Sequence, residues 1–227
     1  MIPPLIVQTA LEKNIDLIAI TDHNASANVR AVQKAAAGTP LTVLPGMEVQ
    51  SREDVHLLTI FETTDALEAW QEEVDKALPD LSNEPDYLGE QFVVDETGDF
   101  LRVEPRLLLT STSFSIDEIF KRIKDLGGLV IPAHVERTTY GLLPILGLIS
   151  ESWQLLALEI SCHSAPEKTI TNFPALRGYP LIQSGDVHHL ESFLGTTVFN
   201  LASPTLMEIQ MAFHRIDGRD VCIKANV

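Results

Sequence analysis

The strongest constraint on this chain is a regular alternation of short apolar runs with stretches of helical spacing. Ile15–Thr21 is an apolar run of the length of one buried strand, and Ala27–Ala37 follows it with helical spacing. Val55–Phe61 and Thr64–Leu78 repeat the same strand–helix order. Alternation of this kind predicts parallel strands with helices outside, as a closed barrel or as a doubly wound sheet.

The same order continues to the end of the chain, with one interruption. Further strands are expected at 41–44, 129–132, 156–160, 181–183, 196–199 and 221–224, and further helices at 5–13, 115–126 and 204–214. The interruption, 79–112, is polar and has two alternating runs around Thr97-Gly98-Asp99, which predicts a hairpin insertion. We therefore expect a single domain, 1–227, that carries this insertion.

Side chains of metal-binding type recur at the ends of the predicted strands. The set is Asp22, His23, Glu48, His56, His134, Asp186 and His188. Single members have ordinary interpretations: His56, within an apolar run, is typical of a buried, hydrogen-bonded histidine, and Glu48 of a loop carboxylate. In a barrel, however, the carboxyl ends of the strands share one face, which carries the chemistry. The recurrence therefore favours a barrel with a shared site.

Imidazoles and carboxylates together suit zinc, manganese or iron, whereas calcium or magnesium alone rarely recruits so many histidines. Two or three such divalent ions could clamp a phosphoryl group and generate hydroxide near neutral pH. The residue types therefore predict a metal-dependent hydrolase.

Five short motifs, in order, resemble those of the polymerase-and-histidinol-phosphatase (PHP) superfamily. They are Thr21-Asp22-His23-Asn24, Gly46-Met47-Glu48, Asp54-Val55-His56, Pro132-Ala133-His134 and Gly185-Asp186-Val187-His188. No single motif is decisive, but the ordered series is specific and spans roughly residues 3–194. The resemblance implies a distorted (β/α)7, TIM-like barrel with up to three metal ions, in a stand-alone short form.

The resemblance also implies a role for most residues of the set. Glu48 would bridge two metal ions, with His56 and His134 joining it on one of them and Asp186 serving the other. His23 and His188 would hold a third ion. Zinc, manganese or iron would be the cofactor.

Two further residues are expected to assist catalysis. Asp22 would orient a histidine that ligates metal. Arg137, one turn beyond His134, would clamp the phosphate through its planar fork of donors, or else is a solvated surface arginine.

One departure from the family pattern affects the expected activity. The family begins with a strand that bears a His-x-His pair and a further histidine, whereas this chain has no histidine before His23. Either Met1 is an internal methionine of a longer chain or the chain is a natural degenerate form. The chain as given is expected to be weakly active or inactive, with a barrel incomplete at its first strand and an open sheet edge through which it associates with itself.

The net charge of −16 makes nucleic-acid binding a poor expectation and leaves a small phosphorylated substrate as the partner. No apolar run is long enough to span a membrane, and the start of the chain does not resemble a signal peptide. A cytoplasmic location is therefore expected, with Cys162 and Cys222 reduced.

Three functions remain open on the sequence. The first is a phosphoesterase that hydrolyses a small phosphorylated metabolite or nucleotide with an activated hydroxide. The second is an amidohydrolase-like metal enzyme, disfavoured because no lysine suitable for carboxylation stands near a strand end. The third is a non-catalytic PHP-like domain with a regulatory or scaffolding role.

Overall fold

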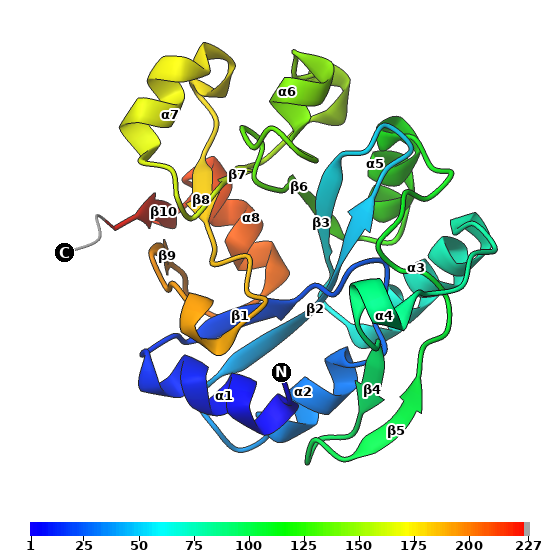
Figure 1. Ribbon diagram of the computed structural model, residues 1–227. Helices are drawn as coiled ribbons and strands as arrows, with labels where there is room; N and C mark the ends of the chain where they lie inside the picture. The colour runs from blue at the N-terminus through cyan, green and yellow to red at the C-terminus, as the bar shows by residue number, and fades with distance from the viewer. Residues whose placement is uncertain (225–227) are drawn as a thin grey trace.

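A computed structural model describes residues 1–224, and its strands lie close to the predicted positions (Figure 1). The strands are β1 (Leu17–Ile20), β2 (Thr42–Gln50), β3 (His56–Ile60), β4 (Phe92–Val94), β5 (Phe100–Val103), β6 (Leu129–Pro132), β7 (Leu158–Ile160), β8 (Leu181–Gln183), β9 (Thr197–Asn200) and β10 (Asp220–Ile223). Every predicted strand is present, and β2 runs well beyond its expected end at Leu44.

The predicted helices are also present, together with short ones that the sequence did not reveal. The helices are α1 (Pro3–Glu12), α2 (Val29–Ala35), α3 (Thr64–Ala77), α4 (Pro85–Leu88), α5 (Ile116–Asp125), α6 (Leu142–Leu146), α7 (Pro166–Asn172) and α8 (Leu206–His214). Short 3-10 turns occupy Glu151–Trp153, Pro174–Leu176 and Leu190–Ser192. Helix α5 begins with a capping box: the Ser115 side chain accepts from the Glu118 backbone N–H, and the Glu118 side chain accepts from the Ser115 backbone N–H.

The main sheet has the strand order β1-β2-β3-β6. Strands β1 and β2 are parallel, but β3 runs antiparallel to both β2 and β6. The prediction of parallel strands throughout is therefore wrong for β3. The cause is the link of residues 51–55, because a parallel crossover needs a dozen or more residues and this link allows only a tight turn.

The reversal of β3 brings His56 to the same edge of the sheet as the ends of its neighbours. His56 is the first residue of β3 and lies opposite Gln50, the last residue of β2. His134 follows the end of β6, and His23 follows the end of β1. A strand start and three strand ends therefore meet at one edge.

The main apolar core lies between this sheet and the helices α3 and α5, which border it in Figure 1. Helix α3 buries Leu67, Trp70 and Val74, whose spacing places them on one helical face. Helix α5 buries Ile119 and Ile123 in the same way. The core therefore fixes β2, β3 and β6 from one side.

A closed barrel is not found among residues 1–224, so the predicted (β/α)7 closure is not confirmed. Besides the main sheet there are three two-stranded sheets: β7–β8 (parallel), β9–β10 and β4–β5 (both antiparallel). In the described chain the outer edge of β1 pairs with no strand. A cavity of about 1560 Å³ lies beside it, lined by apolar residues such as Leu44, Leu58 and Phe193.

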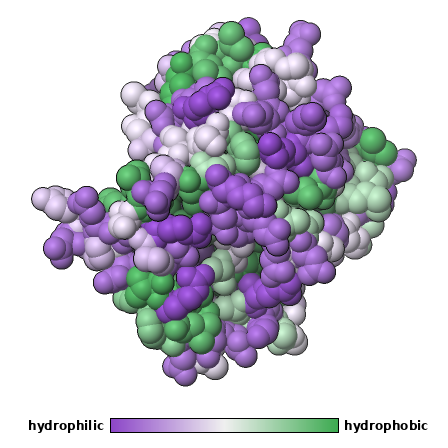
Figure 2. All heavy atoms as spheres, turned by 90° about the vertical axis from the view of Figure 1, so that its right-hand side faces the viewer, coloured by the Kyte–Doolittle hydropathy of each residue, from purple (hydrophilic) through white to green (hydrophobic). Residues whose placement is uncertain are grey.

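Strands β4 and β5 form an antiparallel pair within residues 79–112, where the hairpin insertion was expected, and β5 is exposed along its whole length. The face of the molecule shown in Figure 2 is mostly hydrophilic, with separate hydrophobic patches. Among residues 1–224, no helix combines the length and the apolar character that a bilayer-spanning segment requires.

Candidate metal centre

Glu48 lies at the middle of the candidate site and is almost completely buried. It belongs to β2 rather than to a loop after the strand, which corrects the expected position. Its backbone N–H donates to the Asp22 carbonyl, and its own carbonyl accepts from the Asn24 N–H, so the segment after β1 stays paired to β2. Gly46 permits this approach, because a Cβ there would meet the Thr21 side chain at 2.9 Å.

Three imidazoles surround the Glu48 carboxylate. The His56 Nδ1 lies 2.8 Å from Glu48 Oε1, and the His134 Nε2 lies 3.4 Å from the same oxygen. The His23 Nδ1 lies 3.5 Å from Glu48 Oε2. One ligand atom from each of His23, Glu48 and His56 lies within 4.8 Å of the others, the compactness that a shared cation requires. Four predicted ligands are thus brought together.

The burial of this cluster leaves ring nitrogens without partners. The side chains of His56 and His134 are 4% and 3% exposed. Within residues 1–224, His56 Nδ1 and both ring nitrogens of His134 have no hydrogen bond of acceptable geometry. Because a buried polar group without a partner costs about 1–3 kcal/mol, such atoms call for an explanation, and coordination of a cation supplies one for the two nitrogens that face Glu48, His56 Nδ1 and His134 Nε2.

The protonation states also suit metal binding. Burial alone raises the pKa of the Glu48 carboxyl, but contacts with His134 and His56 and the charges of nearby imidazoles reverse this and lower the pKa well below its usual range. Desolvation lowers the pKa of His23, against the opposing pull of Glu48. The site therefore favours a carboxylate and, at His23, a neutral imidazole, which are the forms that ligate metals.

Asp186 and His188 form a second, more exposed group beside the first. The His188 ring lies 5.9 Å from the His23 ring, centroid to centroid. The Asp186 Oδ2 accepts from Arg137 Nη1 at 2.8 Å. The His188 side chain is 60% exposed, and its Nδ1 lies 2.9 Å from the Asp186 carbonyl. Arg137 is thus ion-paired with a predicted ligand.

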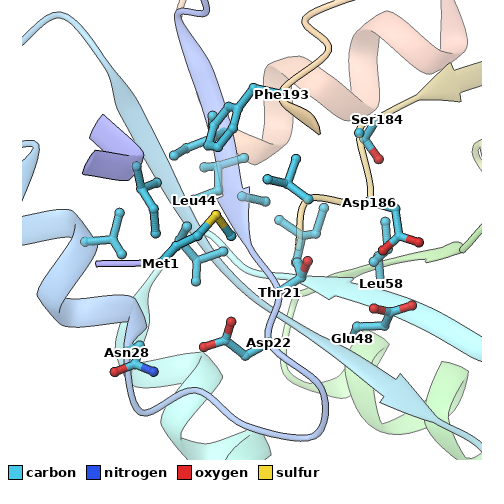
Figure 3. A pocket seen from close by; sticks show the side chains of 18 of the residues that line it. Met1, Thr21, Asp22, Asn28, Leu44, Glu48, Leu58, Ser184, Asp186 and Phe193 are labelled. Atoms are coloured by element: carbon cyan, nitrogen blue, oxygen red, sulfur yellow. The ribbon is translucent and has the colours of Figure 1, made fainter. Parts of the chain in front are cut away.

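Asp22 occupies another part of the cavity. Figure 3 shows the Glu48 and Asp186 side chains on one side of the pocket and Asp22 towards Asn28. The Asp22 side chain is exposed to the cavity, yet the surrounding protein still raises the pKa of its carboxyl by desolvation, and the nearby Asn28 side chain opposes this rise. The contribution of Asp22 to the site is therefore through its backbone, which pairs with Glu48.

Glu159 is a buried carboxylate of the site that the sequence reasoning missed. It lies in β7, its Oε2 accepts from the His134 backbone N–H at 3.1 Å, and its Oε1 accepts from the Ser184 hydroxyl. Desolvation raises the pKa of Glu159 to about 8, and the charges of Glu48, Asp186 and Glu136 add to this rise. A lone glutamate inside the apolar run 156–160 was the available signal.

The backbone is unusual at two of the predicted ligands. His134 has φ +30° and Asp186 has φ +47°, in the left-handed region that non-glycine residues seldom adopt. Both residues lie just beyond the end of a strand, β6 and β8. Such strain concentrates at functional sites, where the surrounding structure holds it in place.

Comparison with known proteins shows a shared fold without close sequence relatives. No family model and no curated protein matches the sequence. The lesion-specific endonuclease PfuEndoQ from Pyrococcus furiosus is similar in structure, with a TM-score of 0.70 and 18% identity over 97% of this chain. The match covers 53% of the endonuclease, so the chain spans about half of its length.

Two further solved structures match over most of their own length. One is described as a metal-dependent phosphoesterase from Bifidobacterium adolescentis. It matches with a TM-score of 0.53 and 18% identity, and the match covers 83% of this chain and 82% of that one. The other is described as an amidohydrolase from Chromobacterium violaceum with bound sulfate. It matches with a TM-score of 0.56 and 16% identity, and the match covers 100% of this chain and 94% of that one. Identities this low show the fold alone, and that fold is consistent with the PHP-type fold that the motif series predicted.

Proposed function

We propose that this chain is a metal-dependent hydrolase of phosphoric esters, with Glu48 as the shared ligand of its metal centre. The observation that carries the proposal is the Glu48 carboxylate enclosed by His23, His56 and His134, with buried ring nitrogens left unpartnered. The donor set of imidazoles and one carboxylate fits zinc, manganese or iron.

The three deepest residues suit a catalytic site. Glu48, His56 and His134 would provide three protein ligands, and catalytic zinc sites commonly have three and keep one position open. His23, with His188 and Asp186 nearby, would hold a second ion on the exposed side of Glu48. When bound, such ions supply Lewis-acid polarisation of the phosphoryl group and an activated water.

The remaining residues of the site bind and orient. Arg137 offers planar donors that can move from Asp186 to a phosphoryl oxygen when substrate enters. Asp22 keeps Glu48 in register through its backbone. Glu159 holds the His134 backbone in its left-handed conformation. Each residue thus maintains a geometry that the reaction needs rather than reacting itself.

The descriptions of two structural neighbours and the net charge of the chain support a phosphorylated substrate. Two of the structural neighbours are described as a lesion-specific endonuclease and a metal-dependent phosphoesterase, and both descriptions denote phosphoester chemistry. The net charge of −16 favours a small phosphorylated substrate over a long nucleic acid, although another neighbour, Endonuclease Q, is described in complex with a 27-mer duplex substrate.

A second candidate is hydrolysis of an amide by the same centre, which the similarity to the amidohydrolase favours. The two candidates differ at Arg137, because a phosphoryl group carries negative charge that an arginine can neutralise and an amide does not. We therefore favour the phosphoester, with the amide as the competing outcome of the test.

The experiment is a hydrolysis assay of the metal-reconstituted protein. The chain is loaded with zinc or manganese and offered p-nitrophenyl phosphate, bis-p-nitrophenyl phosphate and p-nitroacetanilide, with His56→Asn and the surface variant His214→Asn in parallel. We expect the unchanged chain to release p-nitrophenol from a phosphoester. This activity should be abolished in His56→Asn and preserved in His214→Asn. Activity on the anilide alone would select the second candidate, and no metal-dependent activity at all would support the non-catalytic alternative.

A further inference from the structure

The loop between β6 and α6 contacts the candidate metal centre through an aromatic residue, Tyr140, to which no role has been assigned. Tyr140 lies in this loop, and its ring is stacked on that of His56, with centroids 4.3 Å apart and planes 5° apart. Its backbone carbonyl also accepts from the His56 N–H at 3.1 Å. His56 is therefore held by Tyr140 at both its backbone and its ring.

The loop itself is built to keep Tyr140 in this place. Tyr140 has φ +62°, a conformation that is rare for a bulky residue. The next residue is Gly141, where a Cβ would lie 2.2 Å from the Arg137 carbonyl oxygen, so only glycine fits. A strained residue followed by an obligatory glycine indicates that the surrounding structure fixes the position of the tyrosine ring.

Apolar packing does not explain this ring. Tyr140 is only half-buried and is not among the residues of the three hydrophobic clusters described for residues 1–224, in contrast to Tyr179, which packs against the main core. The contact that orients Tyr140 is with His56. Stacking on a ring face leaves the ring edge, where both nitrogens lie, free for a ligand.

We propose that Tyr140 is a positioning residue of the metal centre, which fixes the plane of the His56 imidazole so that its nitrogen and the Glu48 carboxylate converge on one ion. The inference rests on the proposed metal centre. The electron-rich phenol ring also favours the electron-poor imidazole that forms when a histidine ligates a cation. Residues that orient metal ligands typically contribute about 10–100-fold in metal affinity.

The test measures zinc affinity, by competition with a chromophoric chelator, in two variants at this position. We expect Tyr140→Phe, which keeps the stacked ring, to bind zinc within about twofold of the unchanged chain. We expect Tyr140→Asn, which removes the ring while tolerating the left-handed backbone, to bind at least about tenfold more weakly. Melting temperatures of both metal-free variants are recorded alongside.

Phe120→Leu is the matched control, because Phe120 and Trp153 form an equally parallel stack, 5.7 Å and 5°, on another part of the molecule. Equal zinc affinity in Tyr140→Asn and the unchanged chain would overturn the inference, as would an equal loss in Phe120→Leu. If Tyr140→Asn fails to fold without metal, Tyr140→Gly decides in its place, since glycine also removes the ring and adopts the left-handed backbone without strain. Absence of zinc binding in the unchanged chain would instead overturn the proposed function.

Discussion

The two halves of the candidate centre differ in how firmly the fold holds them. Glu48 and His56 lie in the main sheet and His134 follows its strand β6, and their side chains are 7%, 4% and 3% exposed. Asp186 and His188 follow β8, which belongs to a separate two-stranded sheet, and their side chains are 29% and 60% exposed.

The difference separates a preformed site from an adaptable one. On the buried side, main-chain pairing and the apolar core fix the ligands, and unpartnered nitrogens make an empty site costly. On the exposed side, Asp186 is satisfied by Arg137, and water reaches His188. We therefore expect tight metal binding at Glu48, His56 and His134, and weaker, exchangeable binding around Asp186 and His188.

Removing the shared ligand should have the largest effect. In Glu48→Gln the charge that attracts both ions is lost, so we expect activity to fall by at least about 1,000-fold. Steady-state assays with added manganese or zinc measure it, and the melting temperature of the metal-free variant serves as the folding control. If Glu48→Gln kept a tenth of the activity, the buried residues would matter no more than the exposed ones, and the difference between the two sides of the centre would be contradicted.

The buried side should also govern how stability depends on pH. Burial raises the pKa of Glu159 to about 8, above its unfolded value, so its contribution is complete in acid and is lost as pH rises through 8. We expect the metal-free chain to lose on the order of 3 kcal/mol of unfolding free energy between pH 5.5 and 8 from this group. Glu159→Gln, which mimics the protonated acid, should flatten that dependence.

Urea unfolding at several pH values measures this difference. Glu48 acts in a separate pH range. Because its pKa is lowered in the folded state, its ionised carboxylate stabilises the fold, and this contribution is lost only as pH falls below about 4.5. Parallel pH profiles for Glu159→Gln and the unchanged chain would show that the Glu159 carboxyl is not protonated in the folded state.

Substitution on the exposed side should be milder. Asp186→Asn removes one ligand where solvent can take its place, and we expect activity to fall about tenfold while the ion at Glu48 is retained. Metal analysis after dialysis, combined with assays over a range of metal concentrations, checks this. Recovery of activity at high metal concentration is expected, and loss of the dialysis-resistant ion would place Asp186 in the tight site.

The smallest effect is expected at Arg137. Arg137→Lys keeps the charge but loses the planar fork, so we expect KM for a phosphomonoester to rise about threefold with little change in kcat. Inhibition by inorganic phosphate should weaken in parallel. An unchanged KM would identify the arginine as a partner of Asp186 alone.

The sequence predicted the strands and long helices well because each has a strong local signal. Helices α3 and α5 are examples, since the apolar spacing of α3 and the capping box of α5 depend on residues close in the chain. The direction of β3 was missed because periodicity does not encode strand direction. The five-residue link 51–55 held that information, and its length alone excluded a parallel crossover.

The site was predictable where ligand-type residues stand at strand ends and not where burial decides the role. His23, Glu48, His56 and His134 come together, although the motif series assigned His23 to a separate ion with His188. Glu159 acquires its raised pKa only from tertiary burial among other carboxylates. Tyr140 reaches His56 only through a left-handed turn, and the sequence Thr139-Tyr140-Gly141 carries no pattern that predicts it.

The most direct test of the central claim is the metal content of the purified chain after reconstitution with zinc and exhaustive dialysis. Plasma mass spectrometry is applied to the unchanged chain, His134→Asn and His188→Asn. We expect about one zinc per chain in the unchanged protein and in His188→Asn, and none in His134→Asn, because three ligands are the usual protein complement of a catalytic zinc. No retained zinc in the unchanged chain, or full retention in His134→Asn, would contradict a metal centre at Glu48, His56 and His134.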